Sequence, residues 1–100
     1  MARMRFEIEL TDEAVADFKA LKASWRVTVK YAMEIHLRHE PEKVSRSRIK
    51  RLRELSKPQF RLRVEDLRVF YDVEGGIVTV HAIILKLEAA SWLAQFGESK

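Results

Sequence analysis

Three arginines and one aromatic residue fall at positions that would bring them together on one face of a β-sheet. Arg61 and Arg63 alternate with apolar residues, and Arg68 and Phe70 do the same after a two-residue turn at positions 65–66. Pairing across that turn places Arg63 opposite Arg68 and Arg61 opposite Phe70. Two arginines that face each other destabilise an antiparallel pair. We therefore expect this face to serve a function that needs positive charge.

Phosphate binding is the chemistry that such a face favours. Guanidinium groups match phosphate oxygens with paired N–H donors, and Phe70 could give a base a stacking surface. A second turn at Gly75–Gly76 would place His81 opposite Phe70, and Ile83 opposite Arg68. The ordinary pKa of His81 suits proton transfer near neutral pH.

The charge distribution agrees with a polyanion-binding surface. Residues 46–63 hold eight basic side chains and one acid, a net +7, whereas the whole chain carries +4 and the remainder therefore −3. A basic stripe on a slightly acidic body is typical of such proteins. In the alternative interpretation, the stripe is a solvated surface, the last helix covers Phe70 and Ile83, and His81 is structural. The arginines would then pair with nearby acids, drawn from Glu65, Asp66, Asp72 and Glu88.

Hydrophobic periodicity predicts the elements that carry these residues. The helix-forming segments are punctuated by expected N-caps at Thr11 and Ser24 and by stops at Pro41 and Gly97. We predict a strand at 4–10, helices at 12–22 and 25–39, one or two helical turns within 42–58, strands at 60–64, 67–73 and 77–85, and a helix at 88–96. The order β-α-α-β-β-β-α predicts an α+β fold, one domain over residues 1–100, with an antiparallel sheet, a helical hairpin on one face and a C-terminal helix.

Several classes of function lack support in the sequence. There is no cysteine, which excludes thiol chemistry and zinc–thiolate sites. His36 and His39 lie three residues apart on one expected helix, but no third ligand follows at a suitable spacing. The start of the chain has no apolar signal core, and no apolar run is long enough for a membrane span. We expect a cytoplasmic protein that does not contact a membrane.

The hairpin sequence resembles the RelE/ParE superfamily of type II toxins. Arg63 to Val73 reads RVEDLRVFYDV, Gln59 to Arg63 reads QFRLR, and the basic leucine-bearing segment IKRLR precedes them at 49–53. The first strand and its acidic-capped helix also look like that family. The resemblance covers nearly the whole chain and favours the RelE-like branch.

The resemblance implies a ribosome-dependent mRNA endoribonuclease that uses the RNA 2′-hydroxyl as nucleophile, without metal or cofactor. Arg61 and Arg63 match residues that bind and orient RNA, and Arg68 matches the arginine that stabilises the phosphate in the transition state. Leu87, and Trp92 or Leu93, stand where such members have an arginine and a tyrosine. Lys86 could replace that charge, and His81 or Glu88 that proton carrier. Further RNA contacts are expected from Lys50, Arg51, Arg53, Lys57 and Phe70.

Two other functions stay open at this stage. A ParE-like protein would poison DNA gyrase without being an enzyme, and a non-toxic member would act only within a repressor complex. All of these share a cognate antitoxin as the expected partner. A ribonuclease would also meet the ribosome and mRNA, and operator DNA would be reached only through the antitoxin.

Overall fold

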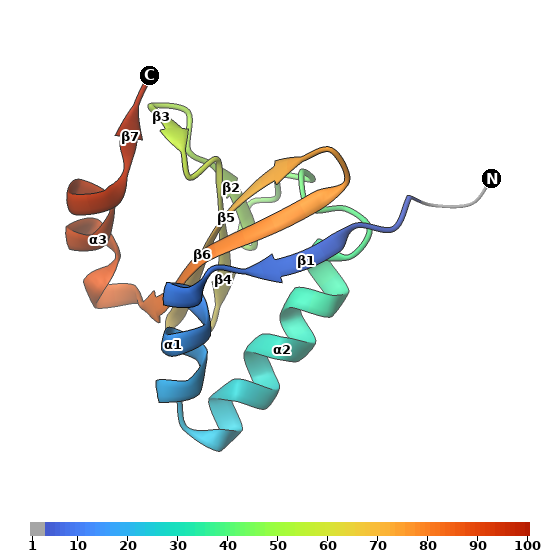
Figure 1. Ribbon diagram of the computed structural model, residues 1–100, viewed down its shortest axis with the longest axis vertical. Helices are drawn as coiled ribbons and strands as arrows, with labels where there is room; N and C mark the ends of the chain where they lie inside the picture. Colours follow the sequence, from blue (N-terminus) through green and yellow to red (C-terminus); the bar gives the residue numbers. More distant parts are fainter. Residues whose placement is uncertain (1–3) are drawn as a thin grey trace.

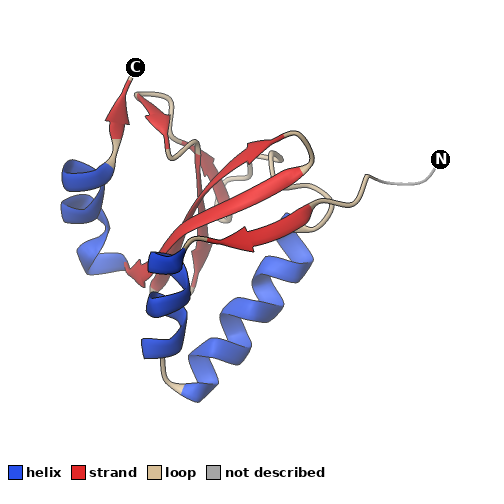
Figure 2. Ribbon diagram, in the orientation of Figure 1, coloured by secondary structure: helices blue, strands red, loops and turns tan. Residues whose placement is uncertain are grey.

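A five-stranded sheet organises the computed structural model, which describes residues 4–100. The strand order is β1-β6-β5-β4-β2, antiparallel except for the parallel β1–β6 pair, and β3 and β7 form a second, two-stranded sheet (Figures 1 and 2). The elements are β1 (Glu7–Leu10), α1 (Asp12–Ala20), α2 (Ala23–Leu37), β2 (Ile49–Arg51), β3 (Leu55–Lys57), β4 (Phe60–Val64), β5 (Leu67–Glu74), β6 (Ile77–Leu85), the 3₁₀ helix η1 (Lys86–Glu88), α3 (Ala89–Phe96) and β7 (Glu98–Ser99). The α+β class is confirmed.

The helical hairpin forms as expected, with one difference at its second cap. The Thr11 hydroxyl accepts a hydrogen bond from the Ala14 backbone N–H at 3.1 Å, and two acids follow in the first turn of α1. In α2, however, the N-cap is Lys22 and no side chain caps the helix. The prediction of Ser24 as the cap is wrong because the backbone is already helical from Ala23, a good helix former.

The prediction of helical turns within residues 42–58 is also wrong. Ile49 is buried opposite Leu62 of β4, and Lys50 is exposed opposite Arg61, so β2 alternates as a strand at the sheet edge. Pairing with β4 supplies backbone hydrogen bonds and burial that a short isolated helix cannot provide. Farther along, β3 pairs with β7 near the C-terminus, a contact with no sequence signal.

The hydrophobic core lies between the sheet and the α1–α2 hairpin. Tyr71 of β5 is fully buried at its centre, and its hydroxyl donates to the Pro41 carbonyl at 2.6 Å. Its ring stacks on Phe60 with centroids 5.4 Å apart. Core residues from the sheet and both helices include Ala14, Val29, Met33, Leu37, Leu62, Val69 and Val80. The opposite sheet face is therefore left for α3 and for polar residues.

A β-bulge in β6 changes the predicted register. Both hairpin turns are as expected, with positive φ at Gly75 and Gly76, and Asp72 pairs with Thr79. Between Phe70 and Tyr71 the register then shifts, so Phe70 faces Ala82 rather than the predicted His81, and Arg68 faces Ile84 rather than Ile83. The bulge inserts one extra residue into β6 and re-aims the side chains beyond it. Ile83 therefore enters the core, and its predicted place beside the arginines is wrong.

Candidate phosphate-binding face

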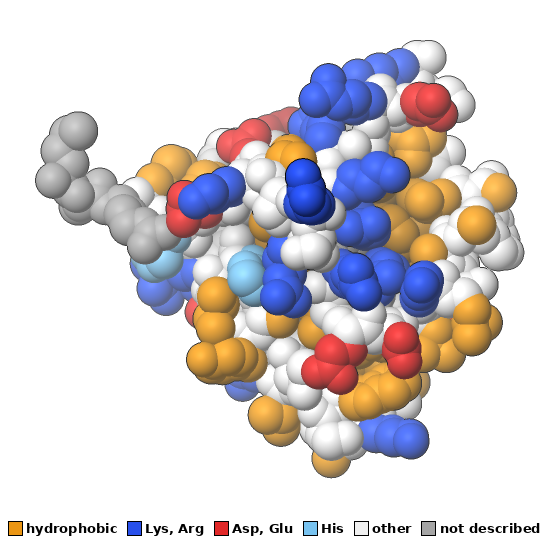
Figure 3. Space-filling view, turned by 180° about the vertical axis from the view of Figure 1, so that it is seen from behind, with side chains coloured by type: hydrophobic (Ala, Val, Ile, Leu, Met, Phe, Trp, Pro, Cys, Tyr) orange, Lys and Arg blue, Asp and Glu red, His pale blue; other side chains and the backbone are white. Residues whose placement is uncertain are grey.

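Four basic residues form the candidate site, which we call the arginine face. Lys50 of β2 pairs with Arg61 of β4, and Arg63 of β4 pairs with Arg68 of β5. Alternation places all four side chains on the sheet face opposite the core. Lys and Arg side chains gather across the middle of the surface in Figure 3. The predicted pairings of Arg63 with Arg68 and of Arg61 with Phe70 are confirmed.

Arg68 is held rigidly at one end of this face. Only 6% of it is exposed, and its Nη1 donates to the carbonyls of Glu65 and Leu67, each at 2.8 Å. These bonds depend on the β4–β5 turn, where Glu65 adopts a φ of 52°. Burial and the neighbouring Arg63 lower the pKa of Arg68, and Asp66 opposes that shift. The guanidinium thus keeps a fixed position while other N–H donors remain available.

Arg61 carries an unmet hydrogen-bonding need. Its Nε is buried and has no hydrogen-bond partner among residues 4–100. Burial, followed by the charges of Arg68 and Arg63, lowers the pKa of Arg61. A buried donor without a partner costs about 1–3 kcal/mol, and more when the group is charged. A phosphate bound at the arginine face would offset the repulsion among the three arginines.

The alternative of a surface ion network finds no support at these arginines. Within the described part of the chain, no carboxylate forms an ion pair with Arg61, Arg63 or Arg68. Asp72 accepts instead from the Gln59 backbone N–H and contacts His81 Nε2, both at 2.7 Å. Burial would raise the pKa of Asp72, but hydrogen bonds from His81 and Gln59 outweigh it and lower that pKa.

Phe70 and α3 separate His81 from the arginines. Along β5, Phe70 lies on the same face between Arg68 and Asp72, and Trp92 of α3 stacks on it at 5.0 Å between centroids. Phe70 is only 1% exposed. The prediction that Phe70 offers a base a stacking surface is therefore wrong for this conformation, because Trp92 already occupies its face.

The other predicted RNA contacts lie in two places. Lys50, Arg51 and Arg53 line one groove between β2, β3 and α3. Lys50 also joins the arginine face, whereas Arg51 turns to the core side, where its guanidinium lies 4.9 Å from the centre of the Phe60 ring. Lys57 lies apart from them, in a cavity that also contains His81. Sequence reasoning did not foresee the Lys50–Arg61 pairing, although the order Ile49-Lys50-Arg51 carries a strand-like alternation.

The two remaining candidates lie in η1. The Lys86 backbone N–H donates to the Asp66 carbonyl at 2.7 Å, which places Lys86 beside the β4–β5 turn that holds Arg68. Glu88 instead lies near Asp17 of α1. Burial raises the pKa of Asp17, and the negative charges of Glu88 and Glu13 raise it further. Neither of the predicted proton carriers, His81 and Glu88, has a described contact with an arginine of this face, whereas the backbone of Lys86, predicted to replace the missing charge, lies beside the turn that holds Arg68.

No three His, Asp or Glu residues among positions 4–100 are grouped so that they could hold a metal ion. None of the helices in that range has both the length and the apolar character of a membrane span.

The arrangement of helices and strands is the RelE-like toxin fold, as comparison with solved structures shows. The chain is similar to the structure of an archaeal RelE–RelB complex from Pyrococcus horikoshii OT3, with a TM-score of 0.68 and 18% identity over 83% of this chain and 97% of that one. It is also similar to a RelB–RelE antitoxin–toxin complex from Methanococcus jannaschii, with a TM-score of 0.64 and 15% identity over 84% and 96%. No protein-family model and no curated protein sequence matches the chain.

Proposed function

We propose that this chain is the toxin of a type II toxin–antitoxin pair and cuts mRNA with its arginine face. The observation that carries the proposal is the cluster of Arg61, Arg63 and Arg68, three neighbouring guanidinium groups that form no ion pair with a described carboxylate. Folding alone gains nothing from this arrangement. The fold shared with the toxin of RelE–RelB complexes supports the same conclusion and favours an antitoxin as partner.

The proposed reaction needs electrostatic stabilisation more than a protein nucleophile. The RNA 2′-hydroxyl loses its proton to water and its oxygen attacks the adjacent phosphorus. The bond from phosphorus to the 5′-oxygen breaks, and the leaving oxygen takes up a proton. The products are a 2′,3′-cyclic phosphate and a free 5′-hydroxyl. Arg61, Arg63 and Arg68 stabilise the charge that develops on the phosphate oxygens. We assign Lys86, beside the same hairpin, as the candidate donor to the leaving oxygen.

The testing experiment adds purified protein to ribosomes that carry a defined mRNA and maps cuts by primer extension. Arg63→Gln is the first variant because Arg63 is exposed and its loss leaves the buried contacts of Arg68 intact. Arg5→Gln is the matched control, with the same charge change at an exposed residue outside the basic stripe of residues 46–63. We expect cuts in the decoding site with the unmodified protein and Arg5→Gln, and a loss of at least tenfold with Arg63→Gln and Arg68→Ala.

Other outcomes of this experiment would favour a different function for the same fold. If the mRNA stays intact while expression still arrests growth, the ribonuclease proposal fails. DNA damage and filamentation in those cells would then indicate gyrase as the target. If neither the unmodified protein nor the variants arrest growth, the chain would be interpreted as a non-toxic member of a repressor complex.

A further inference from the structure

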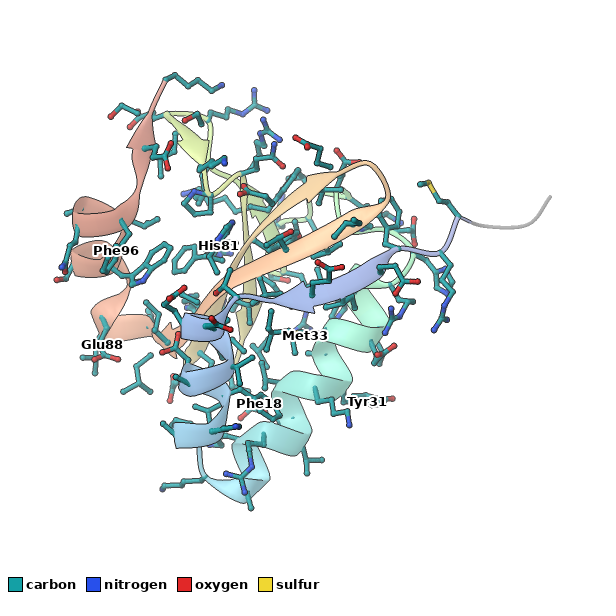
Figure 4. The ribbon with its side chains drawn as sticks, in the orientation of Figure 1. Phe18, Tyr31, Met33, His81, Glu88 and Phe96 are labelled. Carbon is teal, nitrogen blue, oxygen red and sulfur yellow. The ribbon has the colours of Figure 1, made fainter. Side chains whose placement is uncertain are left out.

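A second candidate site lies next to α3, and no residue of the arginine face lines it. It is a cavity of about 540 Å³ between α1, β6 and α3, within the size range of ligand pockets. Its apolar wall is formed by Pro58, Ile84, Trp92 and Phe96. Figure 4 shows His81 of β6 and Phe96 of α3 on the two sides of this space. Phe96 is 55% exposed although it is a large aromatic residue.

The polar lining of this cavity is acidic, in contrast to the basic chain. Glu13 and Asp17 of α1 and Glu98 of β7 line it. The basic residues in the described lining are Lys57 and His81, and His81 contacts Asp72. None of the three acids forms an ion pair with a described residue. One carboxylate oxygen of Asp17 accepts a hydrogen bond from the Ile83 backbone N–H at 3.0 Å, and this bond holds the carboxylate beside β6.

These charges decide which ligands the cavity favours. A nucleic acid strand would bring phosphates against an excess of carboxylates, so RNA is disfavoured here although aromatic rings are present. A cation is favoured, and a planar guanidinium is favoured over an ammonium. Guanidinium groups stack on Trp and Phe faces and bind carboxylates with paired donors.

We propose that this cavity accepts an arginine side chain from a partner protein, with the guanidinium against Asp17 and Glu13 and the stem along Trp92 and Phe96. The inference concerns a cavity that no residue of the arginine face lines, and it does not require that the chain cut RNA. An arginine seated there would also hold α3 against the sheet, because it would contact both walls. The cavity would therefore serve as an anchor point in a protein complex.

The two tryptophans provide an internal reporter and control, since only Trp92 lines the cavity. The indole N–H signals of ¹⁵N-labelled protein are assigned with Trp25→Phe and followed during titration with N-acetyl-arginine amide. We expect the Trp92 signal to shift in a saturable way and the Trp25 signal to keep its chemical shift. N-acetyl-citrulline amide, which has the same shape without the charge, should bind at least tenfold more weakly. Free arginine should also bind more weakly, because its carboxylate meets the acidic lining.

Asp17→Asn tests the site without losing the fold, because an amide oxygen can still accept from the Ile83 N–H. We expect it to weaken arginine-amide binding about tenfold, while Glu42→Gln, the same charge change in an exposed loop, has no effect. Equal binding of citrulline amide, equal affinity in both variants, or tighter binding of free arginine would overturn the proposal. A Trp92 shift with a ribodinucleotide in place of the arginine amide would also overturn it. Arg63→Gln should leave arginine-amide binding unchanged, which separates this test from that of cleavage.

Discussion

Replacement of Arg61 by methionine should stabilise this protein while it abolishes RNA binding. Methionine keeps an unbranched chain of similar reach against the sheet but removes the buried Nε that has no partner. Removal of that donor should gain about 1–3 kcal/mol. Relief of like-charge repulsion with Arg63 and Arg68 should add about 0.2–1 kcal/mol. Because interactions within one cluster are not additive, we expect a total of about 1–3 kcal/mol.

Urea denaturation at low and high salt measures this effect. The midpoint for Arg61→Met should rise with an unchanged m-value, and thermal unfolding should shift upward by roughly 4–8 °C for each kcal/mol in a chain of this size. High salt should narrow the difference, because salt screens the repulsive part. Arg46→Met is the control, with the same change at an exposed residue off the sheet. A destabilised Arg61→Met, or the same gain in Arg46→Met, would refute the idea that Arg61 is held at a cost to folding.

Three further predictions concern the residues that hold the site in place. Tyr71→Phe should lower the free energy of unfolding by about 1–3 kcal/mol, because the buried Pro41 carbonyl loses its hydrogen-bond donor. Chemical denaturation measures this loss, and an unchanged free energy of unfolding would argue against that hydrogen bond. Glu65→Gly should raise stability by about 1 kcal/mol by relieving the positive φ, as thermal unfolding would show, and a loss would indicate that the turn is not strained. The pKa of Asp72 is lowered in the folded state, so its carboxylate contributes stability above its unfolded pKa that is lost as pH falls through the folded value. The deficit of Asp72→Asn in denaturation midpoint should therefore be complete above about pH 4 and shrink progressively as the pH falls below that value. A deficit that stays constant into strong acid would contradict this.

The sequence was sufficient for the elements whose pattern is local. Alternation in β4, β5 and β6, the two glycines of the β5–β6 turn and the Thr11 cap each act over a few residues, and all were predicted. The facing pair of Arg63 and Arg68 followed from the two-residue turn alone. Elements stabilised only by distant partners were missed, because β2 and β3 are too short to show a period before β4 and β7 pair with them.

The candidate site was predicted in part for a related reason. Charge and alternation identified the three arginines. The bulge in β6 is not visible in the sequence pattern, so Ile83 was placed on the wrong face of the sheet. The association of Phe70 with Trp92 depends on how α3 folds back over the sheet, which residue spacing does not specify. The same contact splits the predicted catalytic set into an arginine face and a separate His81 cavity.

The parallel pairing of β1 with β6 has a consequence for the order in which the molecule can be built. Glu7 pairs with Ile77 and Leu10 with Val80, so β1, the first strand to be synthesised, has no partner in the sheet until β6 has been synthesised. Such non-local pairing slows folding, because a long loop must close first. The β4–β5 hairpin can form earlier, since its partners are adjacent in sequence. During translation, the arginine face is therefore assembled before the sheet that supports it is complete.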